Sequence, residues 1–113
     1  MEWPKSSQEL GNLIEEQKLF ELGRSGLISY LHACYEDNPW QFQEVMRADL
    51  ETVMNTYRFR NKIIALNKNY CFDPPEDYLS VNIAIDDGDG DYVCSYTLCL
   101  DLELNVIDDM MGM

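Results

Sequence analysis

The clearest pattern in the chain is an alternation of apolar and polar residues between positions 79 and 107. In its first part every second residue is apolar: Leu79, Val81, Ile83 and Ile85. A period of two is typical of a strand that buries one face. The residues that follow, Asp86-Asp-Gly-Asp-Gly-Asp91, favour a turn.

A second alternation after this turn predicts a second strand. One face of it carries Tyr92, Cys94, Tyr96, Leu98, Leu100 and Leu102. Two amphipathic strands joined by a Gly/Asp turn predict an antiparallel hairpin with one face open to solvent. That open face is expected to carry Ser80, Asn82, Val93, Ser95, Thr97, Cys99, Asp101 and Glu103. Residues 106–110 then predict a third short strand.

The first half of the chain shows helical spacing instead. Ser6 and Glu9 fit a capping box at the start of a helix, and Gly23 fits the position just after its end. A short second helix is expected over residues 27–35. Residues 67–77 contain two consecutive prolines and predict a connecting loop.

The strongest helical period belongs to a third helix. Asn38 is a good N-cap, and Pro39 suits the first helical position. Apolar residues then recur at helical spacing over four turns: Phe42, Val45, Met46, Leu50, Val53, Met54 and Tyr57. Residues 58–66 fit either an extension of this helix or an edge strand, and we favour the helix. This third helix is expected to cover the apolar face of the sheet.

The order of these elements predicts an α+β fold. Three N-terminal helices would pack on one face of a C-terminal antiparallel β-meander of about three strands. The 113 residues suffice for a single domain, 1–113, with a modest core. No apolar run approaches the length of a membrane span. The segment Met1-Glu-Trp-Pro-Lys5 lacks the layout of a signal peptide, so a cytoplasmic location is expected.

The net charge of −13 is unevenly placed along the chain. No Lys or Arg follows Phe72, but eleven acids do: Asp73, Glu76, Asp77, Asp86, Asp87, Asp89, Asp91, Asp101, Glu103, Asp108 and Asp109. Such a field repels nucleic acid and attracts basic protein surfaces. The one basic cluster, Arg58, Arg60 and Lys62, is expected to pair with the chain's own acids.

Familiar catalytic and metal-binding patterns are missing from the sequence. The loop at 86–91 resembles a calcium loop, but Tyr92 and Leu98 stand where an EF-hand needs Gly and Glu, so we favour a solvated turn. Asp108 and Asp109 are strand neighbours that point to opposite faces, so they cannot act as a glycosidase pair. The sequence contains no nucleophile motif for which the single histidine, His32, could act as the base.

The four cysteines, Cys34, Cys71, Cys94 and Cys99, form no Cys-x-x-Cys pair. Cys94 and Cys99 lie five residues apart on one strand and would face opposite sides, so free thiols are expected. We therefore expect no enzymatic activity, no cofactor and no metal. Trp40 is interpreted first as a core or helix-start residue, with an exposed interface anchor as the alternative.

The segment Tyr96-Thr-Leu-Cys-Leu-Asp-Leu-Glu-Leu-Asn-Val-Ile-Asp-Asp109 resembles a recurrent ending of small bacterial immunity proteins. Immunity proteins of this kind neutralise the toxin domains of contact-dependent inhibition and other polymorphic toxin systems. The resemblance covers about the last quarter of the chain and implies a toxin as partner, with a nuclease whose substrate groove is basic as the expected kind. The resemblance does not identify individual binding residues in this chain.

Three functions stay open at this point. The first is an immunity protein that covers a basic surface on a toxin. The second is a nucleic-acid mimic that blocks a DNA-binding protein, and the third is a small ligand-binding α+β domain. For the favoured first function, the predicted partner-binding residues are Asp86, Asp87, Asp89, Asp91, Asp101, Glu103, Asp108, Asp109 and Trp40. The expected partner is a basic protein, with neither nucleic acid nor membrane involved.

Overall fold

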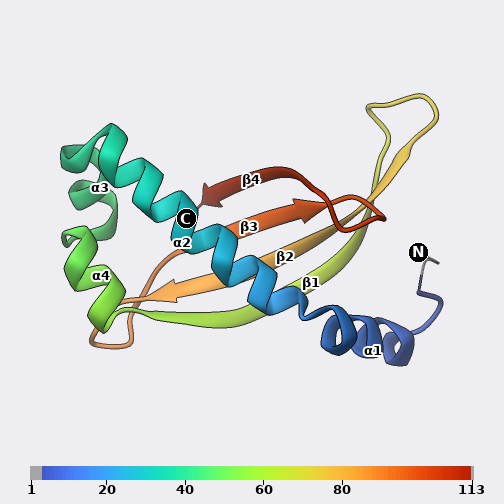
Figure 1. Ribbon diagram of the computed structural model, residues 1–113, viewed down its shortest axis with the longest axis horizontal. Coiled ribbons are helices and arrows are strands. Elements are labelled where there is room, and N and C mark those ends of the chain that lie inside the picture. Colours follow the sequence, from blue (N-terminus) through green and yellow to red (C-terminus); the bar gives the residue numbers. More distant parts are fainter. Residues whose placement is uncertain (1–3, 113) are drawn as a thin grey trace.

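The computed structural model describes residues 4–112, so Trp3 and the two residues before it lie outside the described part. Four helices come first: α1 (Ser7–Gln17), α2 (Leu19–Asp37), α3 (Pro39–Met46) and α4 (Leu50–Thr56). Four strands follow: β1 (Arg58–Asn69), β2 (Glu76–Asp86), β3 (Tyr92–Leu100) and β4 (Val106–Gly112). The strands form one antiparallel sheet in the order β1-β2-β3-β4 (Figure 1). The α+β class and the antiparallel meander are confirmed, with four strands instead of about three.

The predicted hairpin is formed by β2 and β3. Its register pairs Leu79 with Leu100 and Ile83 with Tyr96, so the two apolar rows lie side by side on one face. Eight residues of these rows are at most 2% exposed: Leu79, Val81, Ile83, Ile85, Cys94, Tyr96, Leu98 and Leu100. The alternation therefore predicted the buried face correctly from Leu79 to Ile85 and from Cys94 to Leu100, because period two is a local property of a strand. It was wrong for Tyr92, which is 43% exposed where the pairing of the two strands shifts.

Helix α2, and not the third predicted helix, covers this face. It crosses the sheet diagonally in Figure 1, and Leu19, Leu27 and Leu31 on it belong to the same core as the sheet residues. Two glycines let it approach closely. A Cβ on Gly23 would lie 2.8 Å from Val81 Cγ1, and one on Gly26 would lie 2.6 Å from the Tyr96 hydroxyl oxygen.

Gly23 is therefore a packing residue, and the prediction that it ends the first helix is wrong. The first helix begins as predicted, with the Ser6 hydroxyl accepting the Glu9 N–H at 3.1 Å. It ends earlier, at Lys18, whose φ of 51° lies in the left-handed region. The chain then starts a new helix of 19 residues that runs through both glycines. Helical spacing alone cannot distinguish a glycine at a helix end from one at a close contact.

The predicted third helix is also interrupted. It starts at Pro39 with Asn38 as the cap, as expected, but Arg47 adopts a left-handed φ of 62° and ends it. Asp49 then caps α4 by accepting the Thr52 N–H at 2.9 Å. Phe42, Met46 and Val53 still face the core, as their period predicted. The two short helices lie at one end of the sheet instead of over its centre (Figure 1).

The extension of that helix through residues 58–66 is the largest error of the sequence interpretation. These residues form the edge strand β1, which continues to Asn69 and shortens the predicted loop. The pairing of β1 with β2 shifts between Asn61 and Ile63. Such a bulge adds one residue to the strand and breaks the period of two that would have revealed it.

We expect Gly23→Ala to destabilise the fold by about 1 to 3 kcal/mol, because the new methyl group meets rigid core side chains on β2. Gly11→Ala is the matched control, since a Cβ at Gly11 in the exposed helix α1 has no neighbour within 4 Å. That substitution should stabilise the protein by up to about 1 kcal/mol through helix propensity. Urea unfolding of both variants and of the wild-type protein measures these changes in the free energy of unfolding. Equal effects of the two substitutions would contradict the close packing of α2 on the sheet.

Candidate functional site

The structure separates the predicted partner-binding acids into two groups. The loop between β2 and β3 carries Asp87, Asp89 and Asp91, and the turn between β3 and β4 carries Asp101 and Glu103. Because successive strands of a meander run in opposite directions, these two connections lie at opposite ends of the sheet (Figure 1). The acids on these two connections therefore do not form one continuous surface.

Several of the predicted partner-binding acids make hydrogen bonds within the protein. Asp86 is only 7% exposed, and its carboxylate accepts two hydrogen bonds from the Arg60 guanidinium, at 2.9 and 3.2 Å. The Arg60 hydrogen bonds hold the pKa of Asp86 below its ordinary value. The expectation that Asp86 is exposed is thus wrong, whereas the expected pairing of the basic cluster with internal acids is confirmed at Arg60.

Asp87 and Asp101 hold the shapes of their turns. One carboxylate oxygen of Asp87 accepts the N–H groups of Asp89 and Asp91, at 2.9 and 3.0 Å. Asp101 likewise accepts two backbone N–H groups within its own turn, and these hydrogen bonds lower its pKa. Removing either carboxylate would disturb the loop itself, so a loss of binding in such a variant would be ambiguous.

Asp109 and Asp108 point to different faces of β4, as neighbours on a strand must. Asp109 accepts a hydrogen bond from the Tyr96 hydroxyl at 2.8 Å on the side of the helices. Burial and this carboxylate raise the pKa of Tyr96, so its hydroxyl stays protonated and donates. Asp108 is exposed, and its carboxylate accepts the N–H of Asp109 at 2.9 Å.

The face of the sheet opposite the helices is more neutral than predicted. At its centre Asn82 donates to the Thr97 hydroxyl at 2.7 Å, and Asn67 donates to the Ser80 hydroxyl at 3.0 Å. Val93 and Cys99 were expected to be open to solvent, yet both are buried. Small polar side chains thus cover the middle of this face, and the exposed acids lie toward its ends.

A denser group of acids forms where the structure brings both halves of the chain together. The β2–β3 loop lies beside the end of α4 (Figure 1). A Cβ on Gly88 would lie 3.7 Å from the side chain of Thr56. We call α3, α4, the last turn of α2 and residues 87–91 the helical end. Its acids are Glu36, Asp37, Glu44, Asp49, Glu51, Asp87, Asp89 and Asp91, and Arg47 is the one base within these residues. Arg58 and Arg60 at the start of β1 lie at the same end, beside Asp86, and Arg60 is paired with it. The amino-acid sequence alone does not reveal this group, because the acids and bases of residues 1–72 nearly balance as a whole.

Trp40 stands at the start of α3, within the helical end. Its side chain is 82% exposed, so the favoured interpretation as a core or staple residue is wrong. An exposed Trp is costly to leave in water and is a common anchor of protein interfaces. Of the predicted partner-binding residues, the structure gathers Trp40, Asp89 and Asp91 at one end, with all three exposed.

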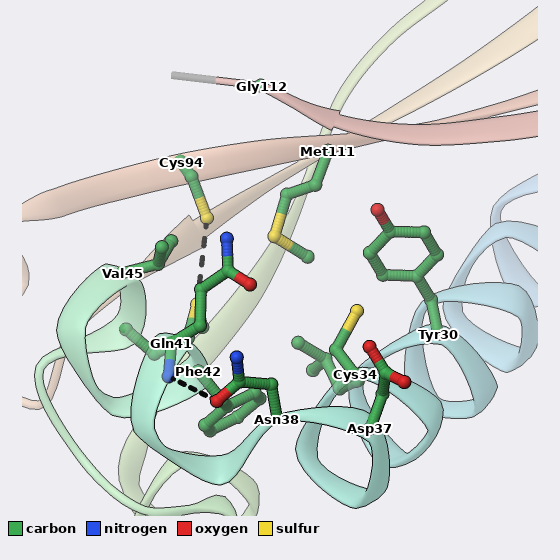
Figure 2. A pocket seen from close by; sticks show the side chains of 12 residues that line it. Tyr30, Cys34, Asp37, Asn38, Gln41, Phe42, Val45, Cys94, Met111 and Gly112 are labelled. Atoms are coloured by element: carbon green, nitrogen blue, oxygen red, sulfur yellow. Dashed lines mark hydrogen bonds between the residues drawn. The ribbon is translucent and has the colours of Figure 1, made fainter.

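A groove of about 430 Å³ opens at the same end, between α2, α3 and the last residues of β4 (Figure 2). Its α2 wall is formed by Tyr30, Leu31, Cys34 and Asp37. Phe42, Val45 and Met46 of α3 form the opposite wall, with Asn38 and Gln41 at the rim. Met111 and Cys94 of the sheet close the groove, and the Cys94 thiol lies 3.8 Å from the Met46 sulfur.

The thiols at the groove are unsuited to nucleophilic catalysis at neutral pH. Burial raises the pKa of Cys94 to about 11. Burial also raises the pKa of Cys34, and the negative charges of Asp37 and Asp109 add to this. A nucleophilic cysteine needs a lowered pKa and a neighbouring base or cation, and no basic residue lines this groove. The four cysteines are free, as the sequence predicted.

Comparisons with models of protein families, with curated proteins and with solved structures gave no match for this chain. Within residues 4–112, no group of three or more His, Cys, Asp or Glu side chains could hold a metal ion. In the same part of the chain, none of the helices is both long and apolar enough to cross a membrane. The candidate site is therefore defined by charge, exposure and shape alone.

We expect Arg60→Gln to destabilise the protein at neutral pH but not in acid. A carboxyl whose pKa is lower in the folded than in the unfolded chain stabilises the fold above the unfolded pKa, which is about 3.9 for Asp. That stabilisation disappears as the pH falls through the lowered pKa of Asp86. Urea unfolding of both proteins between about pH 3 and 8 should show a deficit in the variant that shrinks progressively as the pH falls below about 4.

Lys68→Gln is the matched control for this experiment. Its ammonium lies 3.4 Å from Asp77 in a more exposed pair, so its effect should be smaller. An Arg60→Gln deficit that is as large at pH 3 as at pH 7 would show that the guanidinium acts by packing and not through the charge of Asp86.

Proposed function

We propose that this protein is an acidic inhibitor that binds a basic protein, as an immunity protein binds its cognate toxin. The distribution of charge at the helical end is the observation that carries the proposal. Eight acids and one base occupy residues 36–56 and 87–91. Among them Glu44, Glu51, Asp89 and Asp91 are exposed and none of their side chains pairs with a base in the described residues.

A surface with such an excess of acids over bases costs the isolated protein stability through self-repulsion. A basic partner relieves the repulsion, speeds the encounter and fixes the orientation of the complex. The exposed Trp40 adds an apolar anchor beside the charges, which is the composition expected of an interface centre with a charged rim. A toxin nuclease, whose substrate groove must be basic to hold nucleic acid, is the partner that fits best.

The groove supports a second candidate, a small ligand-binding domain. Its volume lies within the range of ligand sites, and it combines apolar walls with polar groups at the rim. We rank this function below inhibition because the groove is only part of a larger acidic and exposed surface.

The partner can be identified by affinity capture from the native host at low salt, followed by mass spectrometry. We expect a basic domain whose toxicity is neutralised when both proteins are produced together. Association measured by stopped flow should slow markedly as salt rises, because the Debye length falls to about 8 Å at physiological ionic strength. An acidic partner, or a rate that does not depend on salt, would contradict the proposal.

The surface responsible can be located by removing four charges at once. The combined change Glu44→Gln, Glu51→Gln, Asp89→Asn and Asp91→Asn should leave the fold intact, because these exposed carboxylates make no hydrogen bond within the described residues. Association should slow by about tenfold or more.

The matched control removes the same charge from the opposite end of the molecule, by Glu15→Gln, Glu16→Gln, Glu76→Gln and Glu103→Gln. These residues are also exposed. This variant should associate within about twofold of the wild-type rate, since steering depends on where the charges lie. If the control slows association more than the helical-end variant, the interface lies at the other end.

Trp40→Ala tests the apolar anchor separately from the charges. Because the side chain is 82% exposed, the free energy of unfolding should hardly change. The free energy of binding to the partner should become less favourable by about 2 kcal/mol or more, mainly through faster dissociation. Val106→Ala, at another exposed apolar position, is the control. Unchanged dissociation in Trp40→Ala would remove this residue from the interface.

A further inference from the structure

The groove at the helical end is negatively charged and has no cation of its own. Asp37 ends α2 and forms part of the groove wall, and neither Lys, Arg nor His is among the lining residues. Figure 2 shows the Asp37 side chain near Cys34, on the side of the groove that Tyr30 also lines. The last turn of α2 contains no basic residue either.

The walls of the groove suit the hydrocarbon part of a long side chain. Phe42 and Met46 form the buried base of this wall, whereas Val45 is 42% exposed. Met111 closes the groove from the sheet side, and its flexible thioether can adapt to a ligand. An apolar channel that leads to a carboxylate matches a side chain with a long stem and a positive head.

We propose that this groove binds an arginine side chain of the basic partner. The stem would lie against Val45 and Met111, and the guanidinium would meet the Asp37 carboxylate and the amide oxygen of Gln41. This inference rests on the proposed function, since it names the group by which the partner is held. It is also specific to one place, whereas steering by charge involves the whole helical end.

Arginine fits this groove better than lysine for two reasons. Its guanidinium is planar and less strongly hydrated than an ammonium, so it loses less on entering a partly apolar site. It also presents several donors in fixed directions, and the rim offers acceptors from two helices, Asp37 on α2 and Gln41 on α3. A lysine would reach the carboxylate but leave more of these acceptors without a partner.

The inference can be tested on the whole protein without knowing the partner. The probes are three short peptide amides, acetyl-Gly-Arg-Gly, acetyl-Gly-Lys-Gly and the neutral isostere acetyl-Gly-citrulline-Gly, titrated at physiological salt. Amide NMR shifts should saturate with the arginine peptide, at a dissociation constant of about millimolar order, and centre on Tyr30, Cys34, Gln41 and Met111. The citrulline peptide should bind at least about fivefold more weakly because it lacks the charge.

Asp37→Asn should weaken binding of the arginine peptide by roughly five- to tenfold and leave the citrulline peptide unaffected. Glu36→Gln is the matched control, because Glu36 precedes Asp37 on the same helix, is exposed and does not line the groove. It should change binding by less than about twofold. Far-ultraviolet circular dichroism and urea unfolding confirm that both variants are folded.

Two results would overturn the inference. The first is a set of small shifts spread over the acidic surface that never saturate and are insensitive to Asp37→Asn. The second is equal binding of the lysine and arginine peptides, which would exclude a guanidinium site. In either case the proposed function survives if the partner still associates in a salt-dependent way. If the arginine peptide binds saturably but no basic protein partner is found, the arginine site in the groove is supported and the proposed inhibitor function is contradicted.

Discussion

The close packing of α2 on the sheet is the contact on which the other features depend. A four-stranded antiparallel sheet with one apolar face is stable only when that face is removed from water. Gly23 and Gly26 let the helix backbone lie almost directly on Val81 and Tyr96. With α2 in this place, its C-terminal end projects beyond the centre of the sheet and carries α3 and α4 to one end (Figure 1).

This arrangement creates the acidic end of the molecule. Neither the helices nor the β2–β3 loop would be unusual alone, since acids are common on exposed helices and in turns. Their meeting places eight acids at an end where the bases are Arg47 and, on the adjoining β1, Arg58 and Arg60, of which Arg60 is paired with Asp86. The same junction leaves the groove between α2, α3 and β4.

The acids of this protein thus divide by their physical role. Asp86, Asp87, Asp101 and Asp109 accept hydrogen bonds that shape a strand end, two turns and a tyrosine contact. Within residues 4–112, the exposed carboxylates of Glu44, Glu51, Asp89 and Asp91 accept no hydrogen bond and pair with no base, so they can act on another molecule. Sequence alone cannot separate the two kinds, because a carboxylate that caps a turn and one that faces solvent occur in the same Asp/Gly-rich segments.

Local patterns in the sequence determined the elements whose signals are local. The caps at Ser6 and Asn38 and the inward rows of β2 and β3 follow from spacing and side-chain chemistry over a few residues. Tertiary structure decided the rest. It made Gly23 a contact instead of a cap, turned residues 58–69 into a bulged strand, and exposed Trp40. It also brought acids that lie about forty residues apart to one surface. These outcomes depend on which surfaces meet, and a period along the chain does not contain that information.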